Sequence, residues 1–188
     1  SQPTQLAATI TATDVTCFGL NNGSATVNIT GGTNPYTPNW SNGSANATIS
    51  DLAQGNYIVT VTDANGCTVN ANTTINEPAL LTIAVTSTPP LCANSNDGTV
   101  TSNTAGGTLP YQFGLLHNGF PVQNNASGNF NGLSSGNYTV IATDANNCTA
   151  NASTNLVSPN PDVLAYSMQP TSCYGSAYSD GSISVTPI

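Results

Sequence analysis

Residues 52–67 of the chain read LAQGNYIVTVTDANGC, and residues 133–148 read LSSGNYTVIATDANNC, so one stretch occurs twice, 81 positions apart. In both copies an aromatic or aliphatic side chain alternates with Thr, Asn or Ile, and this period of two is typical of a strand with one buried face. The Asp-Ala-Asn that follows favours a tight turn, because Asp bonds its own backbone and Asn or Gly accepts positive φ. The stretch therefore predicts two antiparallel strands joined as a hairpin.

The repetition extends over the rest of the chain. Residues 31–36, GGTNPY, return 75 positions later as GGTLPY at 106–111. The change of offset from 75 to 81 places a six-residue insertion between Tyr111 and Leu133. A proline 14 residues before a cysteine occurs three times, as Pro3 and Cys17, Pro78 and Cys92, and Pro159 and Cys173. We predict two complete modules, at 1–77 and 78–158, and the start of a truncated third at 159–188.

The length of the repeat indicates the fold class. A period of 75 to 81 residues exceeds the roughly 20–50 residues of a solenoid unit and suits a β-sandwich with its own core. In the first module strand-like runs fall at 6–13, 24–30, 35–40, 46–50, 56–62 and 67–75, separated by Gly, Asn and Asp turn signals. The sequence predicts an all-β chain of tandem Ig-like β-sandwich modules, each with six or seven short strands. Because only a Glu77-Pro78 or Ser158-Pro159 step joins the modules, we expect a stiff rod.

Charge is almost absent. The 188 residues include no Lys or Arg, 8 acidic residues and one His, and the net charge is −8. Nucleic acid is excluded as a partner, and so is anchoring to anionic lipid, because both need cationic side chains. No apolar run approaches the roughly 20 residues of a membrane span, so we predict no membrane insertion in this segment. The chain also lacks a starting Met and a signal peptide, which favours mature material or an internal fragment.

Five cysteines without a Cys-x-x-Cys pair indicate disulfides and an oxidising compartment, hence an extracellular or cell-surface protein. In each module one cysteine follows the first predicted strand and one begins the last. We therefore predict Cys17–Cys67 and Cys92–Cys148 within the modules, each bond contributing about 3–4 kcal/mol. Pairing across modules, for example Cys67 with Cys92, is the alternative. Cys173 is left unpaired, with a partner later in sequence or in a neighbouring chain.

A calcium site and a sugar-binding platform are each weighed against a purely structural interpretation of the same residues. Asp63 and Asn65 are possible calcium ligands, but each module has few carboxylates, so the turn interpretation is preferred and no metal or cofactor is predicted. Several aromatic side chains are candidates for a sugar-stacking platform, but their alternation with polar residues predicts core packing instead. These side chains are Tyr36, Trp40, Tyr57, Tyr111, Phe113 and Tyr138.

Catalytic machinery is not recognisable. His117 is the only histidine, and it lies in the insertion, so the first module lacks it. No Ser-His-Asp set recurs, and the recurring acidic residues are single turn positions rather than carboxylate pairs. We predict no catalytic residues and no enzyme activity.

N-glycosylation sequons are frequent but weakly informative. A chain so rich in Asn, Ser and Thr contains roughly seven by chance, and no sequon recurs at an aligned position. The scarcity of charge is the better argument for a glycan coat, because some other group must keep the surface soluble. The candidate sites are Asn22, Asn28, Asn39, Asn42, Asn46, Asn72, Asn125, Asn137, Asn147 and Asn151.

Taken together, the motifs GGT-x-PY, WSNG at 40–43, L-x-x-G-x-Y, VTDANGC and Glu77-Pro78 resemble a known family. They are similar to the SprB-type repeats of large surface adhesins of gliding Bacteroidetes. The resemblance implies an extracellular, Ig-like, tandemly repeated adhesin or filament component, and it brings no catalytic residues. The second module departs from the pattern at Leu115, Asn147 and Ser158, which weakens any shared ligand site.

The leading functional hypothesis is a structural component of an extracellular filament, fibril or stalk, built from disulfide-stapled modules and carrying glycans. Its partners would be further copies of the same repeat. The alternative is a cell-surface adhesin that binds carbohydrate or a solid surface, with the inserted residues 117–121 as the first candidate loop. In a third hypothesis, residues 182–188 complete the sandwich of a neighbour by strand addition.

Overall fold

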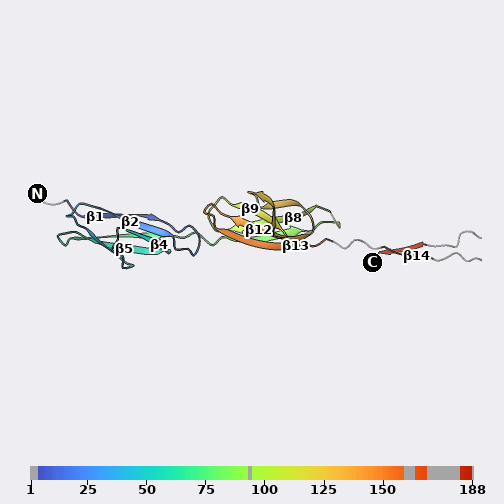
Figure 1. Cartoon of the computed structure of the whole chain (residues 1–188), viewed down its shortest axis with the longest axis horizontal. Coiled ribbons are helices and arrows are strands. Elements are labelled where there is room, and N and C mark those ends of the chain that lie inside the picture. Colours follow the sequence, from blue (N-terminus) through green and yellow to red (C-terminus); the bar gives the residue numbers. More distant parts are fainter. Residues whose placement is uncertain (1–3, 93–94, 159–163, 169–182, 188) are drawn as a thin grey trace, which may run out of the picture.

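The computed structural model describes residues 4–92, 95–158, 164–168 and 183–187, and within them every regular element is a β-strand. Two sandwiches, built from β1–β6 and β7–β13, lie end to end along the long axis (Figure 1). No helix among these residues has the length and apolar character needed to cross a membrane. The predicted all-β, Ig-like fold is confirmed by the strand order described below.

The first sandwich has six strands in two antiparallel sheets. One sheet has the order β1-β2-β4 and the other the order β3-β5-β6. This is how the A-B-E and C-F-G strands of an Ig domain are divided between its two sheets. The strands are β1 (Ala7–Thr13), β2 (Gly23–Thr30), β3 (Thr37–Trp40), β4 (Thr48–Leu52), β5 (Gly55–Thr62) and β6 (Thr68–Ile75).

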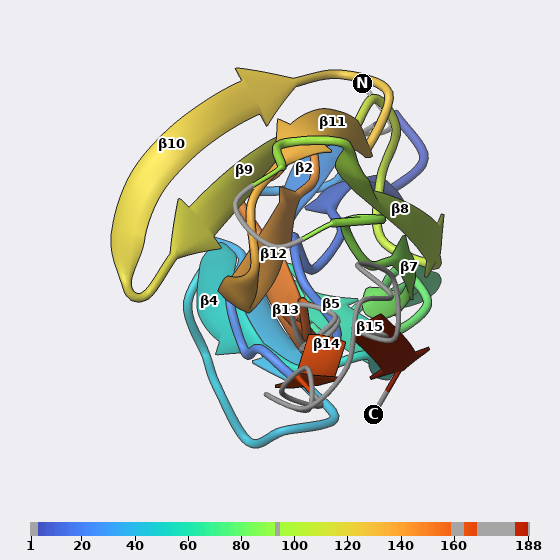
Figure 2. The ribbon, with the colours of Figure 1, turned by 90° about the vertical axis from the view of Figure 1, so that its right-hand side faces the viewer.

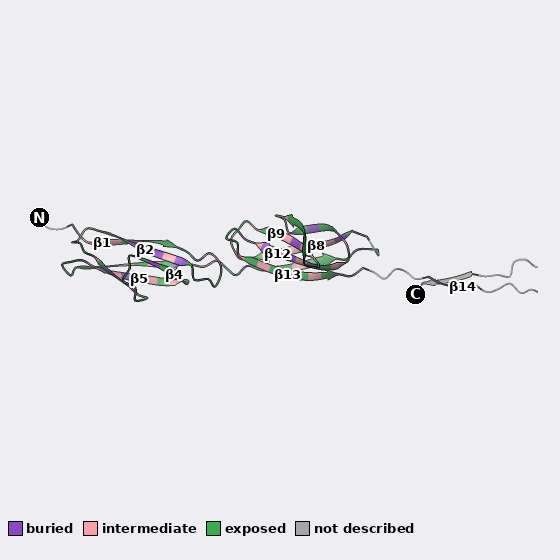
Figure 3. Ribbon diagram, viewed as in Figure 1, coloured by how far each residue is buried: buried purple, intermediate pink, exposed green. Residues whose placement is uncertain are grey.

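The core of this sandwich comes from the alternating side chains of the sequence. Val59 and Val61 on β5 are fully buried, and Trp40 lies opposite Val59 in the register of β3 and β5. The Trp40 Nε1–H donates to the Asn46 carbonyl at 2.9 Å, so its polar edge is satisfied while its ring fills the core. The buried positions alternate with exposed ones along the strands (Figure 3).

The second sandwich repeats this plan with seven strands. One sheet has the order β7-β8-β11 and the other the order β10-β9-β12-β13. Leu115 lies opposite Val140, as Trp40 lies opposite Val59, so a leucine takes the position of the tryptophan in a separate core. The strands are β7 (Thr82–Thr88), β8 (Gly98–Ala105), β9 (Gln112–His117), β10 (Phe120–Asn125), β11 (Asn129–Leu133), β12 (Gly136–Thr143) and β13 (Thr149–Leu156).

The six-residue insertion forms an extra strand and not the loop expected at residues 117–121. β9 and β10 are joined by Asn118 and Gly119, whose φ values of 50° and 86° are those of a two-residue hairpin turn. β10 pairs with β9 and lies at the outer edge of the second sandwich, as the view along the long axis shows (Figure 2). The insertion therefore widens one sheet.

Two sequence motifs form backbone contacts that recur in each sandwich. In L-x-x-G-x-Y the tyrosine hydroxyl donates to the carbonyl four residues upstream, from Tyr57 to Ala53 at 3.2 Å and from Tyr138 to Ser134 at 3.1 Å. This is the tyrosine corner of Ig-like sandwiches. In GGT-x-PY a Cβ on Gly31 would lie 2.0 Å from the Gln5 carbonyl oxygen, so only glycine fits there.

The third, partial unit is described only in its backbone. β14 (Leu164–Met168) pairs antiparallel with β15 (Ile183–Pro187). Cys173 lies outside the described residues, so its predicted lack of a partner stays a prediction. Addition of residues 182–188 to a neighbouring sandwich also stays a hypothesis.

Candidate functional site: the junction between the two modules

A disulfide crosses from the first module to the second. It joins Cys17, in the loop after β1, to Cys148, which precedes β13, with 5.8 Å between the two Cα atoms. The predicted pairings Cys17–Cys67 and Cys92–Cys148 are therefore wrong. Cys67 and Cys92 carry exposed, free thiols. The bond spans 131 positions of sequence and links two separate cores.

The predicted pairing fails because the two cysteines of one module lie at its opposite ends. Cys67 directly precedes β6, whereas the loop of Cys17 meets the far end of β6, where Val15 N–H donates to the Asn76 carbonyl at 2.9 Å. β6 has eight residues, and each residue of a strand advances about 3.3 Å. A disulfide needs a Cα separation of about 4.4–6.8 Å, so this bond cannot form within the module.

Two further contacts support the junction beside the disulfide. The Asn146 side-chain amide donates to the Thr16 carbonyl of the first module at 2.9 Å. Gly19 N–H donates to the Glu77 carboxylate at 2.8 Å, which holds the cysteine loop against the connecting segment. An apolar hollow of about 220 Å³ lies next to the bond, lined by Cys17, Phe18, Leu20, Leu80, Leu81, Cys148 and Thr149.

Asp144 organises the turn that presents Cys148. Asp144 is 5% exposed, and its carboxylate accepts backbone N–H groups from Asn146 and Cys148 at 2.9 Å and from Thr108 at 2.8 Å. Burial acts to raise the pKa of Asp144, but the donors from Thr108, Cys148 and Asn146 together hold this pKa below its usual range. The charged carboxylate thereby fixes both Cys148 and Asn146 toward the first module.

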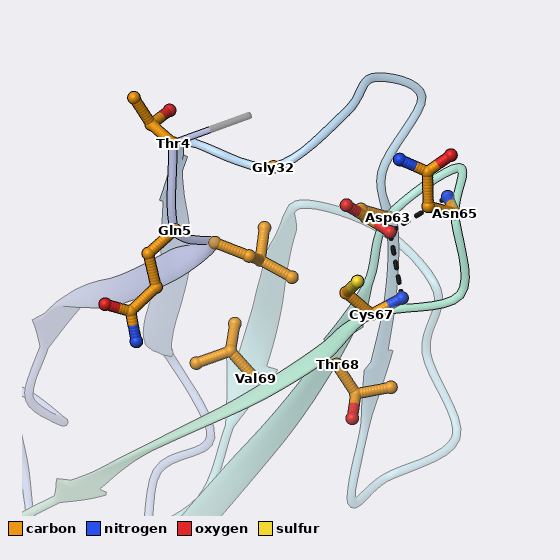
Figure 4. Close-up of a pocket in the computed structure, with 9 residues that line it drawn as sticks. Thr4, Gln5, Gly32, Asp63, Asn65, Cys67, Thr68 and Val69 are labelled. Carbon is orange, nitrogen blue, oxygen red and sulfur yellow. Dashed lines mark hydrogen bonds between the residues drawn. The ribbon is translucent and has the colours of Figure 1, made fainter. Parts of the chain in front are cut away.

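Asp63 builds the same turn at the outer end of the first module (Figure 4). Burial opposes ionisation there too, and the backbone donors of Cys67, Thr33 and Asn65 hold the pKa of Asp63 below its usual range. Its oxygen atoms are directed at backbone amides, as the turn interpretation requires. Among the described residues no group of three or more His, Cys, Asp or Glu side chains is placed to hold a metal ion.

These carboxylates predict an acid-sensitive junction. Because the folded-state pKa of Asp144 is lowered, its stabilisation is complete above the unfolded value of about 3.9 and is lost as the pH falls through the folded value. We expect Asp144→Asn to destabilise the second module at pH 7 and to flatten the fall of its stability below about pH 4. Urea unfolding between pH 2 and pH 7 measures both effects.

The control for this titration is Asp51→Asn. Asp51 is exposed, its carboxylate accepts from the Ser50 hydroxyl at 3.1 Å, and its φ of 56° suits Asn as well as Asp. This variant should keep the acid dependence of the parent chain. An Asp144→Asn variant with the parent's acid dependence would contradict the assigned role of Asp144.

The candidate glycosylation sites are mostly accessible. Nine of the ten asparagines are exposed, and of these Asn28, Asn39, Asn72, Asn137 and Asn151 lie on strands. Asn125 is the exception, because it is half-buried and its side chain is committed to a turn. It accepts from Gly128 N–H at 2.7 Å and donates to the Asn129 carbonyl at 2.8 Å. Glycosylation of the accessible sites stays a prediction.

The aromatic side chains pack into or against the two cores. Trp40, Phe113 and Tyr138 are buried, and Tyr36, Tyr57 and Tyr111 pack against the cores from their edges. His117 stacks on Tyr138, with 4.5 Å between ring centroids. The core interpretation of the aromatic residues is therefore confirmed.

Comparison with known proteins gives a match at the same place in both modules. The family model of the SprB repeat matches residues 9–45 and residues 84–120. Among curated proteins, none matches the chain.

Solved structures give only distant likenesses. The structure titled "Structural basis for Dscam isoform specificity" has 13% identity and a TM-score of 0.37, over 81% of this chain and 46% of that one. The N-terminal eight Ig domains of Down Syndrome Cell Adhesion Molecule isoform 1.30.30 have 14% identity and a TM-score of 0.38, over 88% and 20%. The chain spans less than half the length of either. At these scores they support no functional argument.

Proposed function

This chain carries two SprB-type repeats, which occur in cell-surface gliding adhesins, and from that premise we propose that it is a structural segment of an extracellular filament, fibril or stalk. The observation that carries the proposal is the disulfide from Cys17 to Cys148. The modules are joined once by the Glu77-Pro78 step and a second time by this bond. Two covalent connections at different points restrict bending and twisting, so the pair acts as one length of rod.

The composition supports a load-bearing rather than a catalytic role. SprB repeats and Ig-like domains are typically non-enzymatic, and we propose that this chain has no enzyme activity. Charged residues make up 4% of the chain, so solubility depends on hydroxyl and amide groups. We propose that glycans on exposed asparagines such as Asn39, Asn72 and Asn151 add to this polar surface. Further copies of the repeat would be its partners.

Electron microscopy of the native, unreduced protein tests this function. We expect extended rods in which sandwich-sized units follow one another in a line. Isolated globular particles, or chains folded back on themselves, would overturn the proposal. The intact mass of the segment, compared with 19.0 kDa for the bare polypeptide, reports the glycan load.

The exposed surface of β10 favours one second candidate, an adhesin with its own binding face. Phe120 is 74% exposed on this strand, which the first module lacks, and Val122 is also exposed. Apolar side chains on an added edge strand are a feature of binding surfaces. Binding of the chain to a glycan array that is lost in the Phe120→Ser/Val122→Ser variant would support this candidate, and no binding above background would count against it.

A further inference from the structure

We propose that the Cys17–Cys148 junction is one step of a repeating series, and that the outer end of the first module is an open docking site for another module of the same repeat. This inference rests on the proposed rod and names the residues that would continue it. We call the outer end, formed by residues 4–6, 31–33 and 63–69, the receiving end. The occupant would be a loop equivalent to residues 14–22, whose cysteine would bond to Cys67.

The second module shows what an occupied receiving end looks like. There the Asn146 side-chain amide donates to the Thr108 hydroxyl at 3.1 Å and to the Thr16 carbonyl of the preceding module at 2.9 Å. Gly107 N–H donates to the Ala79 carbonyl at 2.8 Å, which closes the end of the sandwich. Cys148, two residues after Asn146, is bonded to Cys17.

The first module has the same framework already in place. The Asn65 side-chain amide donates to the Thr33 hydroxyl at 2.9 Å, as Asn146 does to Thr108. Gly32 N–H donates to the Thr4 carbonyl at 2.8 Å. The Asp63 carboxylate accepts from Asn65 and Cys67 N–H at 2.9 Å, as Asp144 accepts from its own turn. The receiving end therefore needs no rearrangement to accept a loop.

Within the described residues, the groups that join the modules at Asn146 and Cys148 make no contact with another module at the equivalent Asn65 and Cys67. Within the described residues the Asn65 amide donates only to Thr33, which leaves its second hydrogen for a carbonyl such as that of Thr16. Cys67 is exposed and free. A hollow of about 360 Å³ lies at this end, and its lining residues include Gln5, Leu6, Asn65, Cys67 and Val69 (Figure 4). The hydrogen-bond donor, the thiol and the hollow all lie on one surface.

The far end of the second module carries the complementary group. Leu91 N–H donates to Asp97 at 3.2 Å, as Thr16 N–H donates to Asn22 at 3.1 Å in the first module. Cys92 is exposed and free, at the position equivalent to Cys17. By the same rule Cys92 would bond to the second cysteine of the module that follows.

Cys67 and Cys92 cannot form a disulfide with each other within this chain. Cys67 lies at the outer end of the first module, and Cys92 lies at the far end of the second. The Cys17–Cys148 bond holds the two modules end to end between them (Figure 1). A disulfide at either thiol would therefore join this pair to a module outside it.

Formation of the new bond can be written as two thiol–disulfide exchanges. The Cys67 thiolate attacks an external disulfide, RS–SR, which gives a mixed disulfide and one RS⁻. The thiolate of the incoming loop then attacks the Cys67 sulfur and releases the second RS⁻. The two cysteine thiols are oxidised, the external disulfide is reduced to two thiols, and the two cysteine protons pass to the released thiolates.

Disulfide mapping of the native protein tests the inference. The unreduced protein is alkylated, digested and analysed by mass spectrometry. We expect the peptide containing Cys67 to be joined to a peptide that carries the first cysteine of another module. Recovery of Cys67 as an alkylated thiol, or joined to Cys17, to a second Cys67 or to a small thiol, would overturn the inference.

The same digest separates this inference from the proposed function. The peptide pair Cys17–Cys148 should appear in it as an internal standard. If that pair is present while Cys67 is free, only the repeating series fails and the rod of two modules stands. If that pair is missing, the rigid junction on which the proposed function rests fails as well.

Discussion

When the oxidised chain is stretched by its two ends, residues 18–147 are expected to carry no tension. The Cys17–Cys148 bond is a covalent shortcut, so tension passes from one cysteine to the other and bypasses the backbone between them. The 131 backbone steps from Cys17 to Cys148 would otherwise extend by roughly 450 Å, at about 3.5 Å per residue. Single-molecule force spectroscopy should therefore record this gain in length for Cys17→Ser/Cys148→Ser and not for the parent chain.

The matched control is Cys67→Ser/Cys92→Ser. It removes the same number of sulfur atoms but leaves the junction intact, because both of these thiols are free. Its force–extension record should match that of the parent. Equal length gains in the parent and in Cys17→Ser/Cys148→Ser would contradict the shortcut.

The shortcut gives the proposed rod a mechanical property that the sandwiches alone lack. An Ig-like domain without such a bond unfolds under tension and lengthens. Here nearly all of both cores, including Trp40 and Phe130, lies between the two bonded cysteines. If Cys67 and Cys92 continue the series, a longer fibre would resist extension in the same way along its whole length.

The fold could be predicted because its determinants are local. The alternation of residues 56–62 reports which face of β5 is buried, and Val59 and Val61 are buried as that pattern requires. The tyrosine of L-x-x-G-x-Y bonds a carbonyl four residues away, so its motif is contained in a short stretch. Leu115 could replace Trp40 without loss of the fold, because the register only requires a large apolar side chain opposite Val140.

The disulfide pairing could not be predicted from the order of cysteines alone. Order shows that Cys17 follows one strand and Cys67 begins another, but it does not show which end of the sandwich each occupies. That depends on the direction in which each strand runs, and β6 separates the two residues by its full length. The tight turn at 63–66 was the available signal, because it places Cys67 beside the GGT-x-PY segment and away from Cys17.

The extra strand differs from the sequence prediction for another reason. The prediction places Asn118-Gly119 in a loop, whereas the structure places them at the turn of a hairpin. An Asn-Gly pair between alternating residues is a strong signal for a two-residue hairpin, and the positive φ values of both residues show that it acts as one.

Truncating Phe130 to alanine is expected to destabilise the second module by about 3–5 kcal/mol and to leave the first module unchanged. Phe130 is 1% exposed and belongs to the core of the second sandwich, which shares no residue with the first core. Its counterpart in the first module is Ile49, which is buried in the other core. Ile49→Ala, with an expected cost of about 2–5 kcal/mol, is the matched variant.

The single tryptophan lets the two modules be followed separately. Trp40 lies in the first core, so its fluorescence reports that module alone, whereas far-UV circular dichroism reports both. Both core variants should be made in the Cys17→Ser/Cys148→Ser background, so that the disulfide does not couple the transitions. Phe130→Ala should then shift the urea transition of the second module, which appears in the circular dichroism signal but not in the Trp40 fluorescence. Ile49→Ala should shift the transition recorded by Trp40 fluorescence. If Phe130→Ala shifts the Trp40 signal as far as the dichroism signal, the chain unfolds as one unit and the proposed division into modules 1–77 and 78–158 is wrong.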